Sequence, residues 1–160
     1  MIYTYRYRTP SQFSDLKLVS DGEYLIEVSF INNEEKIIND DSDCFKDAIR
    51  WLDLYFDHKI PDFTPKYRIN DLSEFREKVI RIMEKIPYGK TMTYGQIAET
   101  IAKEKGIPKM SAQAVGGAVG FNPICIIVPC HRVMGAHNRI TGYGGGIKNK
   151  VALLKLEATF

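Results

Sequence analysis

The sequence VPCHRV at positions 128–133 comes at the end of the apolar run ICIIV, positions 124–128. A run of branched apolar residues that ends in proline is typical of a buried segment that stops abruptly. Cys130 is therefore expected at the end of a rigid element. A thiol reacts as a nucleophile in its thiolate form, which a neighbouring base or positive charge favours. His131 and Arg132 supply both kinds of group, so this stretch predicts a reactive cysteine.

Two short helices are predicted upstream of the cysteine, at residues 94–103 and 112–119. Thr93 and Gln96 have the spacing of a capping box before the first helix, and Ser111 is a favourable N-cap for the second. A turn containing glycine and proline joins the two. Two short helices connected in this way resemble a helix-turn-helix.

Another helix is predicted just before this pair. Asp71 and Glu74 also have capping-box spacing, and apolar residues then recur on one face up to Ile86. The sequence Pro-Tyr-Gly at positions 87–89 is expected to end this helix.

The predicted helix at 112–119 contains almost only small residues, AQAVGGAV. Each interior glycine costs about 1 kcal/mol relative to alanine. Such a cost is accepted where another surface approaches the backbone closely, either a packed helix or a nucleic-acid groove. Residues 1–70 carry 9 Lys and Arg against 13 Asp and Glu, whereas residues 71–160 carry 13 against 7. This excess of positive charge favours the groove and indicates an anionic partner.

The first seventy residues have a different pattern. Strands are predicted at 2–8, 13–20 and 23–31, with a hairpin turn at 20–22. A helical stripe of apolar residues follows at 43–55, and then a proline-containing linker at 57–65. We therefore predict an α+β protein: a small N-terminal α/β domain with its linker at 1–70, and a helical C-terminal domain with a helix-turn-helix at 71–160.

The composition limits the class of protein. The chain has 160 residues, of which 44% are hydrophobic and 26% are charged, as in soluble globular proteins. No apolar run approaches the ~18 residues of a membrane span, and the first residues lack the pattern of a signal peptide. Three cysteines, an odd number and widely spaced except for Cys125 and Cys130, do not indicate a disulfide framework. We expect a cytoplasmic protein that does not bind membranes.

Several motifs occur together in this half of the chain. TYGQ at 93–96, AVGGA at 114–118, NP at 122–123, VPCHRV at 128–133 and TGY at 141–143 resemble the methylated-DNA–protein-cysteine methyltransferases. The resemblance covers roughly residues 71–158, whereas the N-terminal part matches only in its general plan of strands followed by a helix. For that part it implies a ribonuclease-H-like domain, with a three-stranded antiparallel sheet and a helix.

The resemblance implies a function in direct-reversal DNA repair. Cys130 would take the alkyl group of O6-alkylguanine as a thioether, once per molecule, with O4-alkylthymine as a second candidate substrate. The partner would be double-stranded DNA, from which the damaged base is flipped out through the minor groove. The protein would act as a monomer, with no metal ion and no organic cofactor.

The resemblance also implies roles for individual residues. His131 would receive the thiol proton through a water molecule, and Glu157 would orient His131. Asn122 would fix the turn that precedes the active-site segment. The residues expected to contact DNA or to form the base pocket are Tyr94, Gln113, Ala114, Gly116, Val133, Tyr143 and Gly144.

One position departs from the family pattern. Many members carry an arginine in the recognition helix, which fills the place of the flipped base, and this sequence has Gln113 there. Glutamine can still intercalate and bond to the orphaned cytosine, but it brings no charge. We expect weaker attraction to phosphate and an intact alkyl transfer.

The same residues allow other interpretations. A zinc site made of Cys125, Cys130, His131 and His137 would lack the usual paired spacing, and Cys44 and Cys125 are more typical of small buried apolar residues. A cysteine hydrolase would leave the small-residue helix unexplained. A helix-turn-helix regulator would bind DNA without needing a reactive thiol. A non-catalytic sensor of alkylated DNA is disfavoured by the presence of Cys130.

Overall fold

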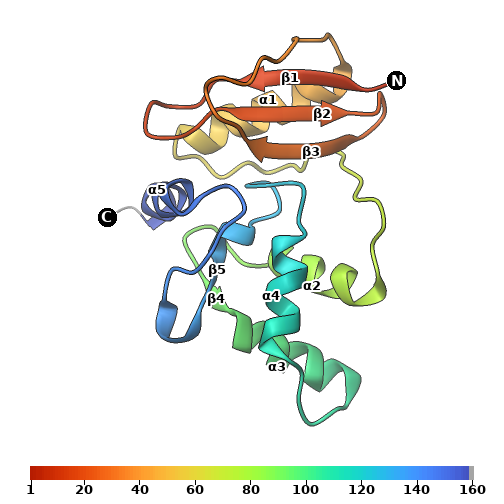
Figure 1. Ribbon diagram of the computed structural model, residues 1–160, viewed down its shortest axis with the longest axis vertical. Coiled ribbons are helices and arrows are strands. Elements are labelled where there is room, and N and C mark those ends of the chain that lie inside the picture. Colours follow the sequence, from red (N-terminus) through yellow and green to blue (C-terminus); the bar gives the residue numbers. More distant parts are fainter. Residues whose placement is uncertain (159–160) are drawn as a thin grey trace.

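The computed structural model describes residues 1–158 and places a β-sheet above a group of helices (Figure 1). The sheet contains β1 (Tyr3–Tyr7), β2 (Leu16–Ser20) and β3 (Leu25–Phe30), antiparallel and in that order. One helix, α1 (Asp43–Phe56), covers a face of this sheet. The predicted strands, hairpin and helix are confirmed, although each strand is a few residues shorter than the apolar pattern suggested.

The packing of α1 on the sheet follows from its apolar stripe. Leu16 and Leu18 of the central strand are fully buried. The helix turns one face towards them, whose buried residues are Phe45, Ala48, Trp51, Leu52 and Tyr55. Side chains that repeat every three or four positions lie on one side of a helix, so this face is continuous.

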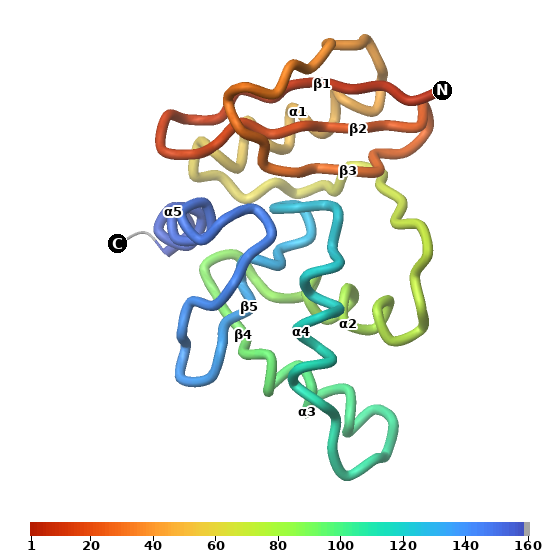
Figure 2. The backbone as a smooth tube through the Cα atoms, in the orientation of Figure 1, coloured from red at the N-terminus to blue at the C-terminus, as the bar shows by residue number. Residues whose placement is uncertain are grey.

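The other half of the molecule is mainly helical. Its elements are α2 (Glu74–Glu84), β4 (Met92–Thr93), α3 (Tyr94–Lys105), α4 (Ala112–Gly120), the 3-10 turns η1 (Cys130–Arg132) and η2 (Ala136–Asn138), β5 (Val133–Met134) and α5 (Ile147–Ala158). The short strands β4 and β5 pair in parallel. Figure 2 shows the chain descending from the sheet to α2 and later returning through α5, which lies just below the sheet.

The helix starts can be compared with the capping signals. Thr93 and Gln96 form the predicted capping box, and Ser111 accepts a hydrogen bond from the backbone N–H of Ala114. The predicted helix α2 is present, but its predicted capping residue was wrong. Its N-cap is Ser73, and Asp71 has a φ of 59° in the left-handed region, so it lies outside the helix.

The apolar run before Cys130 is buried, as predicted, but it has no regular strand structure along 124–128. It touches the edge of β3 at one point, where the Val28 N–H donates to the Pro123 carbonyl at 2.9 Å and the Cys125 N–H donates to the Val28 carbonyl at 3.0 Å. Ile126 then takes a φ of 69°, which turns the chain sharply. The rigid element that carries Cys130 is thus a buried, irregular segment fastened to the sheet.

The buried side chains of the two halves belong to one contiguous core. The division into domains at residue 70 stays a prediction. Within residues 1–158, no helix has the length and apolar character needed to cross a membrane.

Replacement of Leu18 by alanine tests the importance of this core. Leu18 is fully buried in the central strand, so Leu18→Ala should lower the free energy of unfolding by about 2–5 kcal/mol. Ile38→Ala is the matched control, because Ile38 is 78% exposed and its loss should change the free energy by less than about 0.5 kcal/mol. Urea unfolding measures both. Similar small losses in the two variants would contradict this description of the core.

Candidate active site

Cys130 lies at the wall of a small pocket between the helical elements. The pocket has a volume of about 80 Å³ and is referred to below as the Cys130 pocket. Its lining residues are Tyr94, Gly116, Val119, Gly120, Asn122, Cys125, Cys130, Gly142, Tyr143 and Gly144. Three separate parts of the chain therefore meet around one thiol: the helix-turn-helix, the segment before Cys130 and the glycine-rich loop after it.

Asn122 holds the segment that leads to Cys130. Its Nδ2 atom donates to the carbonyls of Val128 at 3.0 Å and Ile124 at 3.3 Å, and its Oδ1 atom accepts from the Ile124 N–H at 3.0 Å. An amide side chain can make this set of bonds because it carries both donors and an acceptor. The buried turn before Cys130 therefore has its polar backbone groups satisfied from inside.

The surroundings of Cys130 favour its thiolate. The Cys125 thiol is the strongest influence, followed by the side chains of Asn122 and Tyr143 and the charge of Lys150. Together they outweigh the effect of burial and lower the pKa of the Cys130 thiol. The pKa of Cys125 is instead raised far above its ordinary value, because of its interaction with the neighbouring Cys130 and its own burial. Of the two thiols, Cys130 is thus the one prepared to act as a nucleophile.

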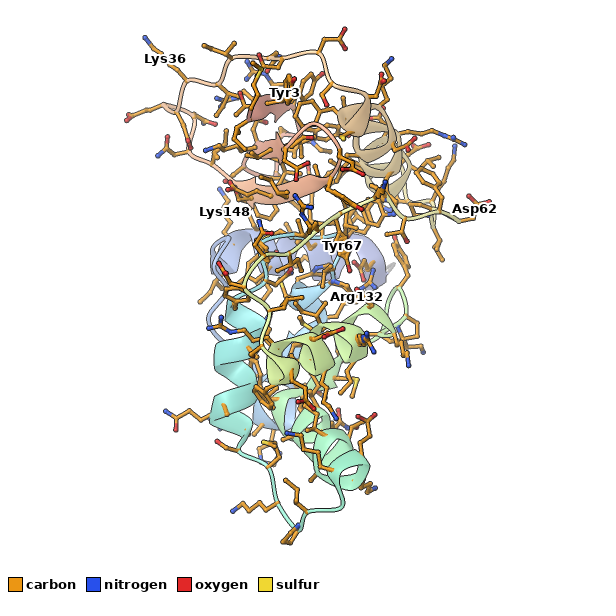
Figure 3. The ribbon with its side chains drawn as sticks, turned by 90° about the vertical axis from the view of Figure 1, so that its right-hand side faces the viewer. Tyr3, Lys36, Asp62, Tyr67, Arg132 and Lys148 are labelled. Atoms are coloured by element: carbon orange, nitrogen blue, oxygen red, sulfur yellow. The ribbon has the colours of Figure 1, made fainter. Side chains whose placement is uncertain are left out.

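Behind Cys130, His131 belongs to a buried ionic network. Its Nε2 atom lies 2.5 Å from Oε2 of Glu157, which is on α5. Arg132 binds the same carboxylate with two nitrogens, Nε to Oε1 at 2.7 Å and Nη2 to Oε2 at 3.0 Å. All three side chains are buried. Figure 3 labels Arg132 near the middle of the molecule. It lies between the sheet half, which contains β1–β3 and α1, and the helical half, which contains the elements from α2 to α5.

This network determines which nitrogen of His131 can accept a proton. A carboxylate only accepts hydrogen bonds, so Nε2 carries the hydrogen and Nδ1 carries the lone pair. Burial lowers the pKa of His131 despite the nearby carboxylate, and the ring is therefore neutral at pH 7. Among the described residues 1–158, nothing forms a hydrogen bond to Nδ1, although this atom is buried. A buried, neutral imidazole with a free lone pair is suited to act as a base.

Glu157 is ionised in spite of its burial. Burial alone would raise its pKa, but the hydrogen bond from His131 and the bonds and charge of Arg132 lower the pKa far below the usual glutamate value. Arg132 supplies the permanent part of this effect, because His131 is uncharged at neutral pH.

Two buried polar groups near the site were not predicted from the sequence. Tyr55, on α1 in the sheet half, donates its hydroxyl to Oε2 of Glu157 at 2.5 Å. Lys150, on α5, is 1% exposed and donates Nζ to the Val133 carbonyl at 2.6 Å. Tyr55 fitted the apolar stripe of α1 and Lys150 resembled an ordinary surface lysine, so neither gave a signal in the sequence.

The residues predicted to contact DNA or a base fall into two sets. Tyr94, Gly116, Tyr143 and Gly144 line the Cys130 pocket. The remaining three lie outside its lining, since Gln113 and Ala114 are exposed on α4 and Val133 is buried in β5.

The glycines of α4 are not explained by packing inside the protein. A Cβ atom at Gly116 would lie 3.9 Å from the ring of Tyr94, in ordinary contact, whereas one at Gly117 or Gly120 would meet no atom within 4 Å among residues 1–158. Packing among the described residues therefore does not require glycine at 116, 117 or 120. Contacts within residues 1–158 therefore do not account for the bare, exposed face of α4.

The candidate zinc ligands do not come together. Within residues 1–158, no group of three or more His, Cys, Asp or Glu side chains is arranged to hold a metal ion. His137 is exposed on η2, whereas Cys130 and His131 are buried. Cys44 is only half-buried, which corrects its expected place in the core, and Cys125 is buried as expected.

Comparison with known proteins connects this site to one group. Residues 74–159 match the family described as 6-O-methylguanine DNA methyltransferase, DNA binding domain. A methylated-DNA–protein-cysteine methyltransferase of Methanosarcina acetivorans is 42% identical over 154 residues, which cover 93% of this chain and 95% of that protein. A protein of the same name from Haemophilus influenzae is 34% identical over 163 residues, covering 98% and 86%.

Solved structures agree with the sequence comparison. The crystal structure of the O6-methylguanine methyltransferase of Mycobacterium tuberculosis has a TM-score of 0.80 and 35% identity, and covers 99% of this chain and 94% of that one. A structure of the Mycobacterium tuberculosis protein in complex with DNA has a TM-score of 0.79 and 36% identity, with coverages of 99% and 92%.

The buried carboxylate gives a prediction about stability and pH. Glu157→Gln should lower the free energy of unfolding by about 3–5 kcal/mol at pH 7, because Arg132 would remain buried without its counter-charge. Since the native pKa of Glu157 is depressed, this difference is fully present above the ordinary glutamate pKa of about 4.3. It should shrink as the pH falls below that value, as measured by urea unfolding over a pH series.

Glu77→Gln provides the control for this measurement. Glu77 pairs with Arg81 on the surface of α2, where an ion pair is worth no more than about 1 kcal/mol. A stability difference for Glu157→Gln that stays constant through the glutamate range of pH would refute the assignment of a buried, ionised carboxylate.

Proposed function

Since the chain belongs to the 6-O-methylguanine DNA methyltransferase family, we propose that it repairs DNA by moving the alkyl group of O6-alkylguanine onto Cys130. The observation that carries this proposal is the place of Cys130 in its pocket. Its thiol pKa is lowered by polar neighbours, and the next residue is a neutral imidazole with a free lone pair. This is what a displacement by sulfur needs.

The proposed reaction is a single displacement at carbon. The thiolate of Cys130 attacks the O6-alkyl carbon, a C–S bond forms and the C–O bond breaks. The bonding electrons pass to O6, and guanine regains its ordinary form when a proton is bound at N1. The balance is complete with the thiol and the damaged base as the only reactants, so no cofactor is proposed. The thioether cannot return the alkyl group, and each molecule therefore acts once.

His131 and Glu157 would prepare the nucleophile. His131 would take the thiol proton at Nδ1 through a water molecule, and Glu157 would hold the ring by its other nitrogen. Asn122 would keep the segment before Cys130 in place and help to stabilise the thiolate. These assignments follow the roles of base and orienting group in other activated nucleophiles.

DNA would bind across the exposed face of α4. Gln113, Ala114 and Gly117 are exposed there, beside the opening that Gly116 and Tyr94 form. A bare helix face lets the backbone approach a minor groove closely, and Gln113 would fill the place of the flipped base. The base would enter the Cys130 pocket between Tyr94 and the loop of Tyr143 and Gly144. Val133 would act indirectly, through its carbonyl bond to Lys150.

The protein is proposed to act as a monomer in the cytoplasm. One chain contains every side chain that the reaction requires, which supports activity as a monomer. Free thiols at positions 44, 125 and 130 support a reducing, cytoplasmic location. O4-alkylthymine stays a second candidate substrate.

Intact-protein mass spectrometry tests the transfer. The protein is mixed with duplex DNA that contains one O6-methylguanine, and we expect a gain of one methyl group, located on Cys130 by peptide mapping. The gain should stop at one equivalent because the thioether is stable. Cys130→Ser should gain no mass. Cys125→Ser should still gain one methyl group, because Cys130 is present.

The alternatives predict different results in the same experiment. Tight binding to the damaged duplex without any mass gain would replace the proposal with a sensor of alkylated DNA. Neither mass gain nor preference for damaged DNA would favour a helix-turn-helix regulator instead.

The DNA-binding role of α4 gives a second prediction. Gly117→Ala should raise the free energy of unfolding by about 1 kcal/mol, because alanine favours the helix and the new methyl group meets nothing in the protein. The same methyl group should weaken binding to duplex DNA, as measured by fluorescence anisotropy. A more stable protein with weaker DNA binding is an unusual combination, and packing alone does not explain it.

Thr100→Ala is the control for this substitution. Thr100 lies on α3, and its replacement also raises helix propensity without changing the charge. It should leave DNA affinity unchanged. Unaltered affinity in Gly117→Ala would show that this face of α4 does not approach DNA.

A further inference from the structure

We propose that Tyr55 is a positioning residue for the alkyl transfer, which the sheet half supplies to the site through Glu157. This inference rests on the proposed function of Cys130. Tyr55 is on α1, 102 positions before Glu157 in sequence, and its hydroxyl donates to Glu157 Oε2 at 2.5 Å. The same oxygen accepts the hydrogen bond from His131 Nε2, also at 2.5 Å. Tyr55 is thus one carboxylate oxygen away from the imidazole.

The tyrosine is held in one orientation. Its side chain is fully buried, and its ring stacks on Trp51 with the ring centres 5.3 Å apart. Its ring also meets Phe56 and Tyr88 edge-on, at 5.3 and 6.0 Å. A hydroxyl on such a fixed ring has little freedom, so together with Arg132 it fixes where the carboxylate oxygen lies.

The chemistry of the hydroxyl makes it a permanent donor. Burial, and then the charge of Glu157, raise the pKa of Tyr55 far above its ordinary value, so the phenol keeps its proton at any pH at which the protein works. It cannot replace His131 as the base. Its effect is on Oε2, where a short hydrogen bond withdraws electron density that the imidazole would otherwise receive.

Two consequences for His131 follow. Oε2 is held in line with Nε2, which keeps Nδ1 as the nitrogen with the lone pair. The shared oxygen is also a weaker partner for a protonated ring, so His131 stays neutral and available as a base at neutral pH. A hydroxyl at this point therefore both orients the carboxylate and limits its pull on the imidazole.

Other charged or titratable groups face this network from the helical half. Arg132 faces Glu157 from η1, and Tyr88 lies in the segment between α2 and β4. Lys150 faces Cys130 and His131 from α5. None of these groups is on α1, and Tyr55 is the group that α1 places against the Glu157 carboxylate.

The test compares Tyr55→Phe with the wild type in a single-turnover methyl-transfer assay over a pH series. The substitution removes one hydroxyl and keeps the ring. We expect the transfer rate at neutral pH to fall by about 3- to 10-fold, the effect of one hydrogen bond. Because Oε2 then interacts more strongly with the imidazolium, the pKa of His131 should rise. The acidic limb of the rate profile should move to higher pH.

Tyr7→Phe is the matched control. Tyr7 is also a buried tyrosine of the sheet half, and its hydroxyl donates to the carboxylate of Asp53 at 2.7 Å, away from Glu157. This variant should lose a similar amount of stability and keep the wild-type rate and pH profile. A loss of stability by itself would therefore change neither the transfer rate nor its pH profile.

Nitrogen NMR of the imidazole rings gives a readout that does not depend on activity. The titration of His131 should shift to higher pH in Tyr55→Phe and stay unchanged in Tyr7→Phe. If Tyr55→Phe has the rate profile and the His131 titration of the wild type, the inference is wrong even though transfer to Cys130 stands. If the wild-type protein transfers no methyl group, the proposed function fails, and the His131 titration alone decides whether Tyr55 acts on the network.

Discussion

A buried carboxylate is the constraint around which this molecule is organised. Within residues 1–158, Glu157 accepts five hydrogen bonds, from Tyr55, the Gly89 N–H, His131 and two nitrogens of Arg132. A carboxylate without partners is very costly to bury, so these donors must all be in place for the charge to be tolerated. They come from α1, from the turn after α2 and from η1. Only the complete fold brings them to one point.

The sheet half takes part in the site more directly than a support would. The edge of β3 bonds to the segment 123–125 that leads to Cys130. On the opposite side, α1 reaches the Glu157 carboxylate through Tyr55. The segment that leads to Cys130 and the Glu157 carboxylate are therefore each bonded to the same part of the molecule, one through β3 and the other through α1. The two halves thus share hydrogen bonds at the site as well as a single core of buried side chains.

Features coded by short-range pattern could be predicted from the sequence. The capping box of Thr93 and Gln96, the strands and the apolar stripe of α1 depend on neighbours a few positions apart, and the structure has them. Asp71 was predicted as the N-cap of α2 where the structure has Ser73. Either side chain can cap a helix, and only the backbone angles decide between them. The irregular course of 124–128 was not predictable, since an apolar run specifies burial and leaves the conformation open. Tyr55 and Lys150 could not be recognised because their partners are distant in sequence and an aromatic or a lysine side chain is ambiguous without them.

The sequence separations within the Glu157 network have a meaning for how the chain folds. Its partners lie 102, 68, 26 and 25 positions away, and contacts that close such long loops form late, after local helices and hairpins. A partly folded chain can therefore contain α1, α3 and the hairpin while His131 and Glu157 are still apart. In such a chain Cys130 lacks the buried polar neighbours that lower its pKa in the native state. The lowered pKa of the Cys130 thiol is thus a property of the native state, and its appearance during refolding would report when these long loops have closed.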